Sequence, residues 1–279
     1  MNIIIRRLTS TAEHYTHTKF IFLLMSNESG HSNLTHPLVK SVPIVLASLV
    51  GISTIGWLVQ TIRIRFQPRR LTTLVLLSHL SLFIELVLRA VYFNDASRTR
   101  TIYTVSGMLL AITHRALTLS NYEFILQLSE FTACLSRTIN ISAVICCVSS
   151  AVIMSISSRM LYNTRNLKLA FVLRQTACAM IFAVALLFYS IWFATKPFIN
   201  KSKQAMILLI TSSLSCLVIS IYLIVTSVPY YYYQSNEIKF GFYLFQIIPQ
   251  IIALFTWTIC HPGRHQFTHT TAVPVECDD

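Results

Sequence analysis

The sequence predicts an all-α integral membrane protein, built as a bundle of seven transmembrane helices. Seven apolar stretches follow one another along the 279 residues, and short charged or turn-rich segments separate them. A helix rises 1.5 Å per residue, so about 20 apolar residues cross a hydrocarbon core of about 30 Å. That core offers no water to an unpaired backbone group, so each stretch must be helical. Hydrophobic residues make up 54% of the chain and charged residues only 11%, which leaves little polar surface for a soluble domain.

Two N-glycosylation sequons lie in the polar N-terminal region, where they begin at Asn27 and Asn33. Because such acceptors belong to the outer side of a membrane, they predict an extracellular or lumenal N-terminus. Whether the chain starts at Met1 or at Met25 stays open. We expect three regions, an outer tail at 1–40, a seven-helix domain at 41–260 and a cytoplasmic tail at 261–279.

The apolar stretches set the expected helix ranges, which are 42–61, 71–93, 101–120, 138–157, 171–194, 205–228 and 240–260. The third range is the least regular, because it contains His114 and Arg115 in an otherwise apolar segment. The stretch after it, 121–137, mixes Glu123 and Glu130 with aliphatic residues. It fits a loop, an interfacial helix or a shifted span boundary, and the sequence leaves these alternatives open.

Most basic residues lie between the apolar stretches, which accounts for the net charge of +12 without a nucleic-acid partner. The densest group separates the first two helices and consists of Arg63, Arg65, Arg69 and Arg70. Because basic residues accumulate in cytoplasmic loops, this group predicts a cytoplasmic first loop. The charge pattern therefore agrees with an outer N-terminus and an inner C-terminus.

The second helix contains the most informative polar residues, Glu85 and Arg89. They are four apart, so they share one helical face and can pair. A charge inside the bilayer is costly when it meets lipid, so we expect both to face the bundle interior, with Ser78 and Ser81 on the same stripe. One interpretation is a structural ion pair, with Arg89 extending toward the outer interface. The other is a lining of a substrate path, and both stay open.

The seventh helix carries a second polar stripe. It consists of Tyr243, Gln246, Gln250 and Trp257, and its first three residues are further candidates for the substrate path. Buried amides form hydrogen bonds between membrane helices. Pro249 stands between the two glutamines and predicts a kink, because proline lacks the N–H that continues a helix.

Two other patterns predict structure and no chemistry. The sixth helix is rich in serine, which predicts close helix packing by Ser212, Ser213, Ser215 and Ser220. Its end is followed by the tyrosines 230–233, whose amphipathic rings prefer the headgroup region of a membrane. These tyrosines predict an aromatic belt.

No motif indicates catalysis or a cofactor. A nucleotide-binding loop, a nucleophile elbow, a zinc-protease helix and a pair of catalytic carboxylates are all absent from the sequence, so we do not expect an enzyme. His261, His265 and His269 have a spacing that suits a metal on a helix. Pro262 and Gly263 break the helix there, so we expect neither a metal nor another cofactor.

The C-terminal region carries a resemblance to a known family. Its residues are Asn236-Glu237, Phe242-Tyr243-Leu244-Phe245, Pro249, Ala253-Leu254 and His261-Pro262-Gly263. An acidic residue, an aromatic stretch, a central proline and a terminal His-Pro-Gly in this order resemble the fungal lipid-translocating exporter family, seven-span proteins linked to aminocholesterol resistance. Glu85 and Arg89 resemble a shortened form of the family's motif in the second helix, whereas the fourth helix lacks its glutamine and glycine cluster. The resemblance implies a divergent member with a glycosylated outer N-terminus.

The resemblance also implies a function, namely the translocation or export of lipid-like or sterol-like amphiphiles, or resistance to them. The expected partners are membrane lipids or lipophilic small molecules, at the plasma membrane or an endomembrane. One alternative is a G-protein-coupled-like receptor, although its Asp/Glu-Arg-Tyr and Asn-Pro-x-x-Tyr patterns are missing. Another is a solute carrier, for which Pro249-Gln250 has no matching pair in the first half of the chain.

Overall fold

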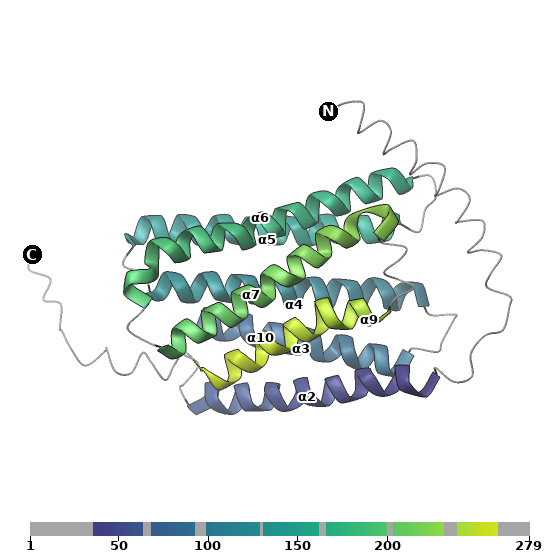
Figure 1. Cartoon of the computed structure of the whole chain (residues 1–279), viewed down its shortest axis with the longest axis horizontal. Coiled ribbons are helices and arrows are strands. Elements are labelled where there is room, and N and C mark those ends of the chain that lie inside the picture. The colour runs from purple at the N-terminus through teal and green to yellow at the C-terminus, as the bar shows by residue number, and fades with distance from the viewer. Residues whose placement is uncertain are drawn as a thin grey trace, which may run out of the picture.

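The computed structural model describes residues 36–63, 68–92, 99–128, 131–161, 166–199, 203–231 and 239–261. Throughout these ranges the regular structure is helical, with no strand, and the helices pack side by side into a bundle (Figure 1). The elements are α2 (His36–Arg63), α3 (Arg69–Tyr92), α4 (Thr99–Leu128), α5 (Ala133–Met160), α6 (Leu167–Ile199), α7 (Lys203–Ser227), α9 (Lys239–Phe242), η3 (Tyr243–Ile247) and α10 (Ile248–Ile259).

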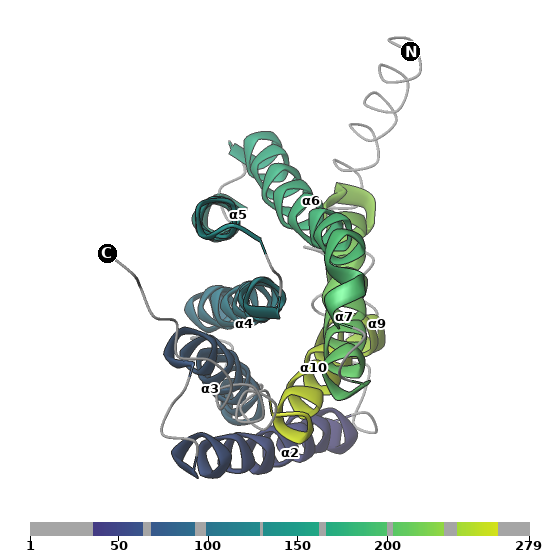
Figure 2. The same cartoon turned by 90° about the vertical axis from the view of Figure 1, so that its left-hand side faces the viewer.

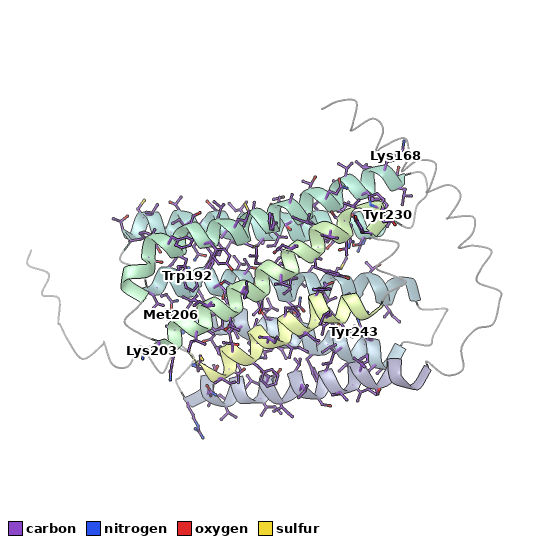
Figure 3. The ribbon with its side chains drawn as sticks, viewed as in Figure 1. Lys168, Trp192, Lys203, Met206, Tyr230 and Tyr243 are labelled. Atoms are coloured by element: carbon purple, nitrogen blue, oxygen red, sulfur yellow. The ribbon has the colours of Figure 1, made fainter. Side chains whose placement is uncertain are left out.

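Successive helices of the bundle run in opposite directions (Figures 1 and 2). Lys168, Tyr230 and Tyr243 lie toward one end, whereas Trp192 and Lys203 lie toward the other (Figure 3). The last helix, formed by α9, η3 and α10 together, runs in the same direction as α2. The start of α2 and the end of α10 therefore lie at opposite ends of the bundle.

Five helices, α2, α3, α5, α6 and α7, are long and apolar enough to cross a membrane. Large apolar side chains are exposed on their outer faces at intervals of three or four residues. On α2 and α5 these include Ile52, Ile55, Val59, Ile62, Ile141, Val144, Val148, Val152 and Ile156. Soluble proteins rarely expose apolar surface of this extent. The fold therefore fits an α-helical membrane protein whose outer surface contacts lipid.

The central helix of the bundle is α4. It contacts α3, α5, α6, α7 and α10, and every residue from 113 to 122 is buried, including His114 and Arg115. A helix covered by other helices needs no apolar side for lipid, which explains why α4 is not among the five helices that are long and apolar enough to cross a membrane. It continues to Leu128, so the stretch 121–137 begins as helix. Of the three alternatives for that stretch, the structure supports a shifted boundary, because the third helix ends later than the sequence predicted.

The last helix changes its hydrogen bonding before Pro249. In η3 the turn is π-helical, and the N–H of Ile248 donates to the carbonyl of Tyr243, five residues earlier. Proline has no N–H and its ring clashes with the carbonyl four residues before it. A wider turn directly before the ring relieves that conflict, and π-turns are a known cause of helix bending. The structure thus accommodates Pro249 with a π-turn where the sequence predicted a kink.

Aromatic side chains hold the last helix against α2 and α4. The ring of Trp257 meets the rings of Trp57 and Phe124 edge-on, with centroids 6.4 Å and 5.6 Å apart. Gly56 brings α2 close to the same region, because a Cβ there would lie 3.2 Å from Thr258 Cγ2. Small residues permit such close approach of membrane helices.

Gly56→Val should lower the thermal stability of the protein, because the added side chain overlaps Thr258 and pushes α10 away from α2. Overpacking of this kind costs about 1–3 kcal/mol. Thermal unfolding of the purified protein in detergent measures the change. Gly107→Val is the matched control, because a Cβ at Gly107 meets no atom within 4 Å. Equal melting temperatures of the two variants would contradict a tight contact between α2 and α10.

Candidate functional site

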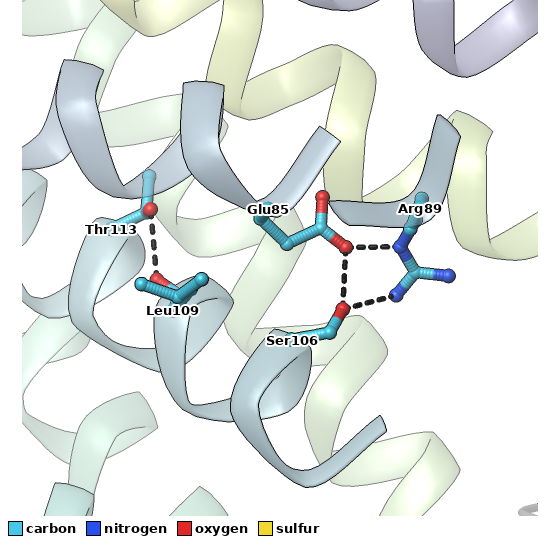
Figure 4. A network of polar contacts seen from close by, with 5 residues as sticks. All are labelled: Glu85, Arg89, Ser106, Leu109 and Thr113. Atoms are coloured by element: carbon cyan, nitrogen blue, oxygen red, sulfur yellow. Dashed lines mark hydrogen bonds and ion pairs between the residues drawn. The ribbon is translucent and has the colours of Figure 1, made fainter. Parts of the chain in front are cut away.

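Glu85 of α3 forms an ion pair with Arg89 one turn later, which confirms the pairing that the spacing predicted. Ser106 of α4 joins both groups: its hydroxyl donates to Glu85 Oε1 over 2.8 Å and accepts from Arg89 Nη2 over 3.2 Å (Figure 4). The guanidinium carbon of Arg89 also lies 4.2 Å from the centroid of the Phe242 ring on α9. We call Glu85, Arg89 and Ser106 the ion-pair network. Glu85 is 0% exposed, so this network places a carboxylate inside the bundle.

Glu85 and Gln250 have unused hydrogen-bonding capacity. Glu85 Oε2 is buried and accepts no hydrogen bond from any described residue, and both interactions of the carboxylate go to its other oxygen (Figure 4). The side chain of Gln250 on α10 is fully buried, and neither its amide nitrogen nor its amide oxygen has a partner among the described residues. A buried polar atom without a partner costs about 1–3 kcal/mol, so a ligand that pairs with these atoms would recover that energy.

The contacts between α3 and the antiparallel last helix place these two groups at a similar level of the bundle. The contacts are a 3.3 Å approach of His79 Nε2 to Thr258 Oγ1 and the approach of Arg89 to Phe242. Glu85 lies between the two contact points on α3, and Gln250 lies between them on the last helix. Both side chains therefore lie between the same two contacts of these helices.

The other predicted path residues differ in their relation to the ion-pair network. Ser78 and Ser81 are buried, but the Ser78 hydroxyl donates to the Leu74 carbonyl of its own helix at 2.9 Å. Gln246 is buried, and the ring of Tyr243 meets the ring of Phe242 edge-on at 5.5 Å. The last helix thus contributes aromatic rings beside the guanidinium, whereas Ser78 uses its hydroxyl within α3.

A second polar cluster joins α2, α3 and α10 through Ser53, His79 and Thr258. His79 Nδ1 lies 2.9 Å from the carbonyl of Val75, which can only accept, so Nδ1 carries the proton and Nε2 is the acceptor. Ser53 Oγ and Thr258 Oγ1 lie 3.1 Å and 3.3 Å from Nε2. Trp57 stacks on the imidazole with centroids 6.1 Å apart. Both ring nitrogens have partners, so this cluster stabilises packing. No local pattern predicts this cluster, because Ser53, His79 and Thr258 lie on helices far apart in the chain.

The structure gives His114 and Arg115 roles that sequence analysis did not assign. His114 Nε2 donates to the carbonyl of Cys216 on α7 at 3.1 Å, and Arg115 Nη2 donates to Ser150 Oγ on α5 at 2.7 Å. Neighbouring residues on a helix point about 100° apart, because one turn holds 3.6 residues. Two adjacent buried polar residues therefore require a helix that is covered on two sides. This was the available signal that the third helix is central.

Several predicted positions lie outside the described residues, namely Asn27, Asn33, His265 and His269. His261 is described, and its ring stacks on Trp57 with centroids 4.3 Å apart. In the described part of the chain, no group of three or more His, Cys, Asp or Glu side chains is arranged to hold a metal ion.

The fold and its buried polar clusters define the class of this protein as a helical bundle that fits an integral membrane protein. No protein-family model, curated protein or solved structure matches the chain. A functional assignment therefore depends on the residues of the chain itself.

Ser106→Ala should destabilise the contact between α3 and α4, because both members of the ion pair lose a hydrogen-bonding partner. Hydrogen bonds between membrane helices are worth about 0.6–2 kcal/mol each. Thermal unfolding in detergent measures the loss. Ser78→Ala is the matched control, because that buried hydroxyl bonds only the backbone of its own helix. A loss as large in the control would show that the Ser106 contacts contribute nothing specific.

Proposed function

We propose that the protein translocates or exports lipid-like or sterol-like amphiphiles, or confers resistance to them, as a multi-pass membrane protein. The observation that carries the proposal is the ion-pair network, which holds a carboxylate with an unpaired oxygen inside a bundle of apolar outer surface. The resemblance of the last helix to the exporter family agrees with this function.

The chemistry of the buried groups fits the polar end of an amphiphile. Glu85 Oε2 accepts a hydrogen bond from a hydroxyl or ammonium group, and the Gln250 amide both donates and accepts. Moving an unaccompanied polar headgroup through hydrocarbon costs several kcal/mol. Partners inside the bundle lower that barrier, while the apolar part of the amphiphile stays in a lipid-like environment.

We further propose that seven helices cross the membrane, including α4 and the last helix. The 30 residues of α4 exceed the length that a bilayer requires, and its buried polar side chains avoid lipid. The last helix extends from Lys239 to Ile259, which corresponds to about 30 Å. The proposed orientation places the N-terminus outside, the C-terminus in the cytoplasm and the protein in the plasma membrane or an endomembrane.

Glu85→Gln should slow lipid movement, because the amide removes the charge that the proposed headgroup contacts. Loss of one charge-assisted hydrogen bond, worth about 1.5–3 kcal/mol, corresponds to about a tenfold reduction or more. The measurement is flux of fluorescently labelled lipid in vesicles that contain only this protein. Glu123→Gln is the matched control, because Glu123 instead bonds Asn140 and Gln127.

A second variant separates transport from folding. Glu85→Arg combined with Arg89→Glu keeps an ion pair between the same two positions, so a purely structural pair predicts normal stability and normal flux. Normal stability with reduced flux supports a role in the path. Unchanged flux in Glu85→Gln with equal protein incorporation removes the ion-pair network from the mechanism. Absent flux in the wild type, together with stimulated nucleotide exchange on a G protein, would favour the receptor alternative.

The sequons provide a test of orientation. Replacement of Asn27 and Asn33 by Gln should give a protein that migrates like the wild type after glycosidase treatment, because an outer N-terminus carries the glycans. An epitope tag on the C-terminus should react with antibody only after the cells are permeabilised. Antibody labelling of intact cells would place both ends on one side and refute the seven-span topology.

A further inference from the structure

Arg115 is a buried cation about midway along α4. It is 4% exposed, and its Nη1 and Nη2 donate to the Ala111 carbonyl at 3.0 Å and to Ser150 Oγ at 2.7 Å. Its Nε–H is also buried, but it has no hydrogen-bond partner in the described part of the chain. A guanidinium has five N–H donors, so these two hydrogen bonds leave much of its capacity unused.

No carboxylate within the described ranges neutralises this charge. Glu85 and Glu123 are the only acidic residues in those ranges. Glu85 pairs with Arg89, and Glu123 accepts hydrogen bonds from Asn140 at 2.7 Å and from Gln127 at 3.2 Å. An uncompensated charge in a low-dielectric interior is costly. An anion from outside the protein would offset that cost.

A second cation lies close to Arg115. Ser150 Oγ, which accepts from Arg115, donates to the carbonyl of Ala177 on α6 at 2.9 Å. Arg174 precedes Ala177 by three residues, so both lie on the same side of α6. The thiol of Cys178 lies within electrostatic range of both guanidinium groups. The junction of α4, α5 and α6 is therefore positive.

We propose that Arg115, assisted by Arg174, binds a phosphate-type oxyanion at the junction of α4, α5 and α6. The planar guanidinium matches two oxygens of a phosphate, which accept from Nε–H and from a remaining Nη N–H. The site contains no residue of the ion-pair network, and the inference does not depend on the proposed movement of amphiphiles. Entry of the oxyanion requires separation of the helices at this junction.

Inorganic phosphate is the first probe. It is added to the full-length protein in non-ionic detergent, and gluconate keeps the ionic strength constant. The wild type should show a saturable rise in melting temperature, because a ligand of the folded state stabilises it by mass action. Arg115→Gln should abolish the rise. Arg115→Lys keeps the charge without the planar fork and should weaken the apparent affinity about tenfold.

A second arm identifies the source of the oxyanion. If phosphatidic acid in the micelle raises the melting temperature and inorganic phosphate does not, the site binds a lipid headgroup. If only inorganic phosphate raises the melting temperature, the site binds free phosphate. Arg159→Gln is the matched control, because Arg159 is exposed in the last turn of α5, and it should respond like the wild type. The proposal is overturned if neither probe raises the melting temperature of the wild type. It is also overturned if Arg115→Gln shows the same rise as the wild type, or if chloride alone produces the rise.

Discussion

The hydrocarbon around the bundle offers no hydrogen-bonding partner, and most of the described structure follows from this constraint. Many polar side chains bond the backbone of their own helix, whereas others bond neighbouring helices, and several of these interhelical bonds converge on α4. Ser106 bonds the ion pair of α3, His114 bonds α7 and Arg115 bonds α5. The helix with the most polar interior is therefore the one with the most neighbours, while α2 and α5 present apolar side chains outward.

The buried polar clusters differ in how completely their groups are paired, and the proposed binding roles depend on this difference. The imidazole of His79 has a partner at both nitrogens, so the cluster of Ser53, His79 and Thr258 holds three helices together. Glu85 Oε2, both polar atoms of the Gln250 side chain and Arg115 Nε have no partner in the described residues. A folded protein bears the cost of such groups most readily where a ligand completes them.

Local patterns predicted the features that depend on neighbours along the chain. The apolar stretches located the helices in the described part of the chain, and the spacing of four residues predicted the pair of Glu85 and Arg89. The predicted helix ends are less accurate, because polar residues such as Asn121 follow the predicted third range, whereas α4 continues to Leu128. Inside a covered helix they are buried, so polarity there reports on neighbouring helices and not on the end of a span.

The sequence by itself determined that this chain forms apolar helices with paired charges on the second one, because hydropathy and spacing along a helix are local properties. Only the tertiary structure decided that Ser106 completes the ion pair and that α4 is central. It also decided that Arg115 lacks a carboxylate among the described residues. These contacts join helices far apart in the chain, and they depend on the tilt and rotation of each helix, which the packing of all side chains sets together.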